Sequence, residues 1–435
     1  MVFISRILAG STTLHTKPTK SDNDPDPYSV SILPKWRNLG LLALAALLAK
    51  GLWFSGSAVI PQLTVEWGLS DAQRAWMTMS VQAGFVLGAM LSAILNLADR
   101  ISAHYLFAAS VMVGAAANSA IAILDNSVGF AFLMRFLTGM AIAGVYPPAM
   151  KLVATWCRED RGLGIGLLVG ALTLGSAMPH LLNGFPLAGA NGMPPWRSVL
   201  VAISALAVVS GVIALFLIRT GPFTEPSPPF NWRFAGDVFK HKPTRLANFG
   251  YLGHMWELYA MWTWVPIFLM LTYERAEWNL QYARLAGFGV IAIGSIGCLM
   301  AGKLADRIGR TTVTTLSLVV SGACALSVGF FLTTPGPLTL LCLIWGFTVV
   351  ADSAQFSAAV SELTDPRYVG TALTVQTCLG FLLTLFSIRI IQPLAEIFGW
   401  EYAFAILSLG PAFGIWSMLS LRRLPEASRM ASGKR

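Results

Sequence analysis

Long apolar runs follow one another along this chain, and short polar turns separate them. Each run is close to the ~20 residues that an α-helix needs to cross the hydrocarbon core of a bilayer. We therefore predict twelve membrane-spanning helices, six before and six after one long polar break. The expected spans are 39–62, 75–96, 104–124, 128–153, 162–186, 196–219, 246–270, 282–301, 311–333, 337–362, 368–392 and 400–421.

The polar stretches divide the chain into five expected parts. These are a flexible tail (1–37), a six-helix bundle (38–219), a linker rich in proline and basic residues (220–245), a second six-helix bundle (246–421) and a final tail (422–435). Most of the 30 Lys and Arg residues fall in the tails, the linker and the loops on the same side of the predicted membrane. Because positively charged loops stay in the cytoplasm, we expect both termini there, in a multi-pass protein of the cell (inner) membrane.

One pentapeptide, Leu-Ala-Asp-Arg-Ile, occurs twice, at 97–101 and 304–308. Each copy is the second junction between spans in its half, which indicates an internal duplication. The second copy extends to Gly-Lys-Leu-Ala-Asp-Arg-Ile-Gly-Arg at 302–310 and resembles the loop motif of the major facilitator superfamily of secondary transporters. The resemblance implies an all-α fold of two six-helix bundles with pseudo-twofold symmetry and alternating access about a midplane cavity. It also implies gating by the motif residues Asp99, Arg100, Gly302, Asp306, Arg307, Gly309 and Arg310.

The two copies differ in how closely they match the motif. In the first copy, Leu95 and Ser102 stand where the second has Gly302 and Gly309, so the gating role is less well supported in the first half. We expect the aspartate of each copy to lie at a helix start, where it caps free N–H groups. We expect the arginines to pair with acids on neighbouring helices.

Composition agrees with a membrane protein and excludes several other classes. The chain is 55% hydrophobic and only 12% charged, whereas soluble domains carry about 25% charged residues. The net charge of +9 follows the loops and does not by itself indicate nucleic-acid binding. The five cysteines are scattered and form no CxxC pair, so neither a disulfide framework nor a zinc site is predicted. No HExxH, GxSxG or phosphate-loop motif occurs, so we expect a non-enzyme without cofactor or metal.

Ionisable residues inside spans are candidates for function, because each costs roughly 2.5–3.5 kcal/mol to insert. Lys50 lies near the middle of the first span and needs a carboxylate partner or an anionic ligand. Arg135 lies in the fourth span with Gly139 four residues on, a spacing that resembles a superfamily motif linked to proton or substrate handling. Trp53 and Trp262 are expected to line the cavity with them. The alternatives are structural ion pairs between helices and packing roles for the tryptophans.

A second set of candidates would carry protons. Glu257 lies near the middle of the seventh span, with His254 on the same helical face, and Asp352 lies inside the tenth span. A carboxylate held in an apolar span can exchange a proton for a substrate or a cation, as coupled transport requires. The alternatives are a structural salt bridge between Glu257 and Lys50, and a role for Asp352 in tying two helices together.

These residues together predict a proton-coupled symporter. Lys50 and Arg135 would bind a small anionic solute such as an organic acid, and Glu257 would carry the proton with His254 or Asp352. We expect the protein to act as a monomer in the lipid bilayer, with no nucleic-acid partner. The alternative is a proton-coupled exporter of a hydrophobic or cationic compound, with Glu257 and Asp352 as cation sites.

Overall fold

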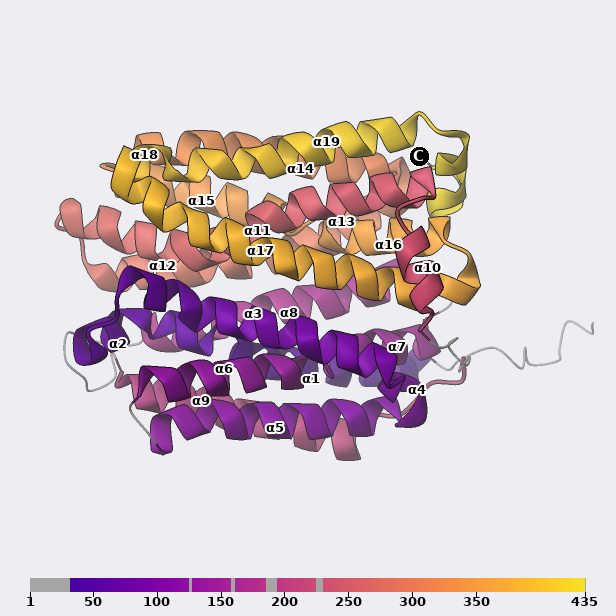
Figure 1. Ribbon diagram of the computed structural model, residues 1–435, viewed down its shortest axis with the longest axis horizontal. Coiled ribbons are helices and arrows are strands. Elements are labelled where there is room, and N and C mark those ends of the chain that lie inside the picture. Colours follow the sequence, from indigo (N-terminus) through magenta and orange to yellow (C-terminus); the bar gives the residue numbers. More distant parts are fainter. Residues whose placement is uncertain (1–31, 125–126, 158–160, 185–193, 224–229, 435) are drawn as a thin grey trace, which may run out of the picture.

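A computed structural model describes residues 32–124, 127–157, 161–184, 194–223 and 230–434. These residues form helices, with no strand among them, and the helices gather into two bundles that lie side by side (Figure 1). The helices of the first bundle are α1 (Ile32–Ala58), α2 (Ile60–Trp67), α3 (Asp71–Ile94), α4 (Leu97–Arg100), α5 (Ala103–Ile123), α6 (Val128–Ile142), α7 (Tyr146–Trp156), α8 (Arg161–Gly184) and α9 (Trp196–Phe216).

A short helix leads from the first bundle to the second. It is α10 (Trp232–Asp237), whose flanking Asn231 hydrogen-bonds through its backbone N–H to Thr371 Oγ1. The second bundle consists of α11 (Lys242–Arg275), α12 (Leu280–Ala292), α13 (Gly294–Ile308), α14 (Arg310–Ser327), η2 (Val328–Phe331), α15 (Pro335–Val349), α16 (Ser353–Leu363), η3 (Pro366–Tyr368), α17 (Val369–Phe398), α18 (Trp400–Ala403), η4 (Phe404–Ser408), α19 (Leu409–Arg422) and η5 (Pro425–Gly433).

Twelve spans cross the predicted membrane. Eleven helical stretches in the described part of the chain are long and apolar enough to do so. The twelfth is α11, whose 34 residues reach about 51 Å at 1.5 Å per residue. Its interior carries Asn248, His254 and Glu257, all buried, and these polar groups lower its hydropathy. The predicted all-α, two-bundle fold is confirmed.

Several spans are interrupted where the sequence predicts one continuous helix. The first breaks between α1 and α2, just before Pro61, and the fourth between α6 and α7, before Pro147 and Pro148. The tenth breaks between α15 and α16 at Asp352. Proline lacks an N–H and disturbs the preceding turn, which explains the first two breaks.

The ends of the five expected parts differ in detail from the observed helices. The first helix begins at Ile32, inside the expected 1–37 tail, and the rest of that tail lies outside the described residues. The expected 220–245 linker contains α10 and the first turn of α11. The final tail is packed: Met430 is fully buried against the second bundle. We call the end of the molecule with α4, α10 and η5 the terminal face; it is on the right in Figure 1.

Two seams join the bundles. In one, α3 packs against α17, and Thr384 Oγ1 donates to Gln82 Oε1 at 2.8 Å. In the other, α8 packs against α12 and α13, with Thr173 Oγ1 4.0 Å from Cys298 Sγ. Both seams lie where the halves meet in Figure 1, so they enclose the space between the bundles.

Candidate functional site

A cavity of about 100 Å³ lies between the two bundles. Both halves line it almost equally, and the first bundle contributes Lys50, Phe85, Ile142, Val145, Tyr146, Val169, Leu172, Thr173 and Ser176. The second bundle contributes Tyr251, Met255, Leu258, Tyr259, Trp262, Val350, Ser353, Ser357, Thr377 and Phe381. The cavity is on the scale of a single-ring solute, and its walls combine aromatic, aliphatic and hydroxyl-bearing side chains.

Lys50 is the one charged side chain among the described residues that line this cavity. It is the middle residue of the helical run Leu33–Trp67, as expected for a group near the bilayer midplane. Its Nζ lies 3.7 Å from the centroid of the Trp53 ring, within range of a cation–π contact. No described residue forms an ion pair or hydrogen bond with it. The cavity wall therefore presents a half-buried lysine that has no counter-ion among the described residues.

An aromatic cluster closes one side of the cavity. Trp53 lies 5.1 Å from Phe85 and 5.1 Å from Phe381, and 5.7 Å from Tyr259, measured between ring centroids. Trp262 lines the cavity itself, whereas Trp53 lies behind Lys50. The indole N–H of Trp262 is buried and has no hydrogen-bond partner among the described residues. A buried donor without a partner is costly, so a ligand acceptor would stabilise it.

Arg135 lies away from the cavity, contrary to its expected place beside Lys50. Its guanidinium is fully buried. It donates to the carbonyl oxygens of Leu52 (2.9 Å) and Met77 (3.3 Å), and also to that of Trp53. Further donations go to Ser55 Oγ at 3.0 Å and to the Asn118 side-chain oxygen at 3.4 Å.

The surroundings of Arg135 explain this position. Gly56 provides the space that the guanidinium occupies, since a Cβ at this position would lie 2.7 Å from Arg135 Nε. Several of the acceptors lie on α1, shortly before its break from α2. The guanidinium therefore ties three helices of the first bundle together through backbone oxygens, and no carboxylate takes part among the described residues.

His254 and Asp352 form a buried pair in the second bundle. His254 Nδ1 lies 2.9 Å from Asp352 Oδ1, and both side chains are 1% exposed. The other ring nitrogen, His254 Nε2, has no hydrogen-bond partner in the described part of the chain. Asp352 stands at the break between α15 and α16, next to Ser353 of the cavity wall. The pair thus lies one residue behind the cavity surface.

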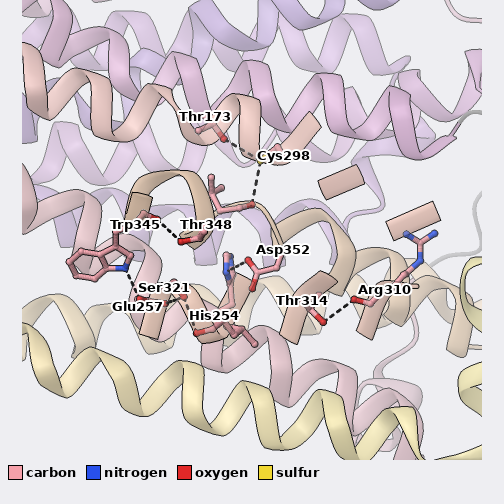
Figure 2. A network of polar contacts seen from close by, with 12 residues as sticks. Thr173, His254, Glu257, Cys298, Arg310, Thr314, Ser321, Trp345, Thr348 and Asp352 are labelled. Atoms are coloured by element: carbon pink, nitrogen blue, oxygen red, sulfur yellow. Dashed lines mark hydrogen bonds and ion pairs between the residues drawn. The ribbon is translucent and has the colours of Figure 1, made fainter. Parts of the chain in front are cut away.

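Glu257 lies in the same bundle but has its own partners (Figure 2). Its Oε2 accepts from Ser321 Oγ at 2.9 Å, and its Oε1 accepts from Trp345 Nε1 at 2.6 Å. The residue is 1% exposed and does not line the cavity. Lys50 and Glu257 form no ion pair. The alternative of a structural bridge between them is therefore wrong for this conformation.

The break at Asp352 is stabilised across the seam. Cys298 donates through its Sγ to the carbonyl oxygen of Val350 at 3.3 Å, and Thr173 approaches the same sulfur from α8 (Figure 2). A residue of the first bundle thus contacts the support of the Asp352 turn, which places the His254–Asp352 pair close to the boundary between the two bundles.

The second copy of the repeated motif forms a clamp at the terminal face. Arg310 donates from Nε and Nη2 to the two oxygens of Glu362 at 2.7 and 2.6 Å, and from Nη1 to Gln355 Oε1 at 2.7 Å. This pairing with an acid on a neighbouring helix is as expected. Gly309 has φ +95°, a conformation that favours glycine. Gly302 is buried on α13, and Arg307 is exposed.

The position of Asp306 corrects one expectation. It lies in the last turn of α13 rather than at a helix start, because the turn to α14 begins only at Gly309. Its carboxylate is 3.9 Å from Arg310 Nη2. It therefore supports the clamp and caps no helix.

The first copy of the motif has a different shape. It forms the four-residue helix α4, with Asn96 at φ +50° before it and Ser102 at φ −55° after it. Arg100 is exposed there, and the side chain of Asp99 lies outside the described residues. The twin loops lie on the same face: Figure 1 places α4 and the final segment at one end, and Lys434 of that segment bonds to the Asp306 carbonyl oxygen.

Comparisons with known proteins decide the family. The model of the Major Facilitator Superfamily matches residues 42–388. The chain belongs to this superfamily. It is a membrane transporter and not an enzyme.

Individual relatives are distant. The NiaP protein of Bacillus subtilis, named as a niacin/nicotinamide transporter, is 22% identical over 377 residues, 78% of this chain and 89% of NiaP. The 4-hydroxybenzoate transporter PcaK of Pseudomonas aeruginosa is 28% identical over 158 residues, 36% of this chain and 34% of PcaK. The inward-facing, unoccupied structure of a bacterial homologue of the human lysosomal transporter Spinster superposes with a TM-score of 0.64 at 16% identity, covering 90% of this chain and 95% of that one.

Sequence reasoning missed most of the cavity wall of this superfamily member. Tyr259 lies two residues beyond Glu257 in α11, but the sequence pattern predicts no functional role for it. In the structure it lines the cavity and its ring contacts Trp53 and Trp262. Ser321, a partner of Glu257, follows no motif at all. One available signal was the density of aromatic and polar residues in α11, which is not among the eleven strongly apolar stretches of the described chain.

Proposed function

We propose that this transporter carries a small aromatic carboxylate across the membrane together with protons. The observation that supports this most is Lys50, a half-buried lysine in the cavity wall with no anionic partner among the described residues. A charge without a counter-ion is costly in an apolar environment. A carboxylate in the cavity would supply the missing charge.

The rest of the cavity favours a ring-bearing anion. Phe85, Tyr259, Trp262 and Phe381 offer aromatic faces, which stack with planar rings. The Trp262 N–H offers a donor that no described residue accepts. The names of two relatives support a small aromatic solute, because one names niacin with nicotinamide and the other names 4-hydroxybenzoate; niacin and 4-hydroxybenzoate are aromatic carboxylates, whereas nicotinamide is neutral.

The proton would be carried by the buried acids of the second bundle. Asp352 and His254 lie one residue behind the cavity surface, and Glu257 lies one turn further along α11. Protonation of these acids in one conformation and release in the other would couple the proton gradient to transport by alternating access. The protein would act as a monomer, with both termini cytoplasmic.

The coupling is tested with Glu257→Gln in proteoliposomes. We expect the variant to lose pH-driven accumulation of the solute while keeping counterflow exchange, since glutamine retains the shape but cannot release a proton. Glu396→Gln is the matched control, because Glu396 is exposed at the far end of α17. Unchanged pH-driven uptake in Glu257→Gln would remove Glu257 from the mechanism.

The second candidate from the sequence, export of a hydrophobic or cationic compound, fits the cavity less well. A cation would meet Lys50, the one charge of the described wall. Competition separates the two: aromatic carboxylates should block transport, and lipophilic cations should not.

A further inference from the structure

A surface groove of about 650 Å³ lies at the terminal face, remote from the central cavity. The first turns of α11 and the last turns of α19 form its walls, and these two helices pack together. Three basic side chains line it, Lys242, Arg245 and Arg423, and no acidic side chain lines it in the described part of the chain.

The basic groups of the groove are largely free. Lys242 and Arg423 are exposed and form no ion pair or hydrogen bond with any described residue. Arg245 uses one N–H, from Nη1 to the Phe239 carbonyl oxygen at 3.3 Å. The first turn of α11 adds positive potential, because its N-cap residue His241 makes no side-chain cap. The groove therefore attracts anions.

The deeper part of the same groove is aromatic. Phe249 and Trp416 line it, and Phe413 links them, with ring centroids 5.3 Å from Phe249 and 5.5 Å from Trp416. Trp416 is 54% exposed toward the predicted lipid phase. Along α11, Phe249 lies seven residues beyond Lys242, a rise of about 10 Å.

The sequence of a basic level followed by an aromatic level along the groove matches the structure of a phospholipid. The basic level coincides with the helix ends, where the headgroups of a bilayer lie, and the aromatic level lies one to two turns deeper, where acyl chains begin. A soluble anion would use only the first level. Basic pockets between membrane helices bind acidic lipid headgroups.

We propose that this groove between α11 and α19 is a binding site for an anionic phospholipid. Lys242, Arg245 and Arg423 hold the headgroup phosphate, and Phe249 and Trp416 hold the start of an acyl chain. The lipid joins the beginning of the second bundle, just after the linker, to its last helix.

Native mass spectrometry of the full-length, detergent-purified protein tests this directly. Phosphatidylglycerol and phosphatidylcholine with identical acyl chains are added in equal amounts. We expect selective retention of phosphatidylglycerol, and a loss of its affinity in Lys242→Gln/Arg423→Gln of about fivefold for each basic residue removed, since each is worth roughly 1 kcal/mol near a lipid surface. Arg422→Gln is the matched control. Arg422 immediately precedes Arg423 in the sequence, but its guanidinium donates to Thr312 Oγ1 at 2.6 Å and does not line the groove.

Three results would overturn the proposal. One is equal retention of the two lipids by the wild type. Another is an equal loss of phosphatidylglycerol in Arg422→Gln and in the double variant. The third comes from a thermal-shift arm with inorganic phosphate: a stabilisation as large as that given by phosphatidylglycerol would show a site for free phosphate. Because the readout is binding, the result does not depend on the transported solute.

Discussion

Replacement of Lys50 by glutamine tests the anion site without changing its size much. The ammonium lies in the cavity wall, 3.7 Å above the Trp53 ring, with no anionic partner among the described residues. If a solute carboxylate completes this pair, Lys50→Gln removes a hydrogen bond to a charged group, worth about 1.5–3 kcal/mol. The dissociation constant of the carboxylate should then rise roughly 10- to 150-fold.

Nicotinate and nicotinamide make the assay specific, because they share a ring and differ in the charge of one substituent. We expect Lys50→Gln to weaken nicotinate by the stated factor in equilibrium binding to purified protein, and to change nicotinamide by less than about twofold. Lys303→Gln, an exposed substitution on α13, should leave both unchanged. Equal weakening of the two ligands, or unchanged nicotinate binding, would refute a charge-based role for Lys50.

Two further predictions concern the first bundle. Gly139→Ala should lower the melting temperature, because an added Cβ would lie 1.9 Å from the Val81 carbonyl oxygen and overpacking costs about 1–3 kcal/mol. Gly129→Ala on the same helix is the control: its Cβ would meet nothing within 4 Å, so the melting temperature should stay unchanged. Arg135→Lys should also lower the melting temperature, since three donors replace five and each acceptor left without a donor costs about 1–3 kcal/mol. Its folded fraction should keep nicotinate affinity within about twofold, and a loss of affinity at unchanged melting temperature would contradict the structural role.

The fold could be predicted from the sequence because bilayer length and periodic turns leave few choices. The twelve spans and the two-bundle arrangement followed from apolar runs and one repeated pentapeptide. The helix breaks did not follow as directly. Pro61 and Pro147 signal two of them, but the turn at Asp352 depends on Cys298 and Thr173, which meet it only in three dimensions.

The sequence shows which charged residues lie inside the spans, but it does not show which partner each of them contacts. Lys50 stood out because a midspan cation is rare, and it does line the cavity. Arg135 stood out for the same reason, yet its guanidinium turns to backbone oxygens of α1 and α3. A linear sequence shows that a charge is buried but not which way it points. The pairing of His254 with Asp352 rather than with Glu257 likewise depends on how α11 packs against the turn between α15 and α16.

The central claim is that protons drive an aromatic carboxylate through the cavity between the bundles. Uptake of radiolabelled nicotinate into proteoliposomes of the purified wild-type protein, under an imposed pH gradient, tests it most directly. We predict accumulation that collapses on addition of a protonophore, that 4-hydroxybenzoate inhibits, and that a lipophilic cation leaves unchanged. Absence of gradient-dependent uptake, or inhibition by the lipophilic cation alone, would contradict the account.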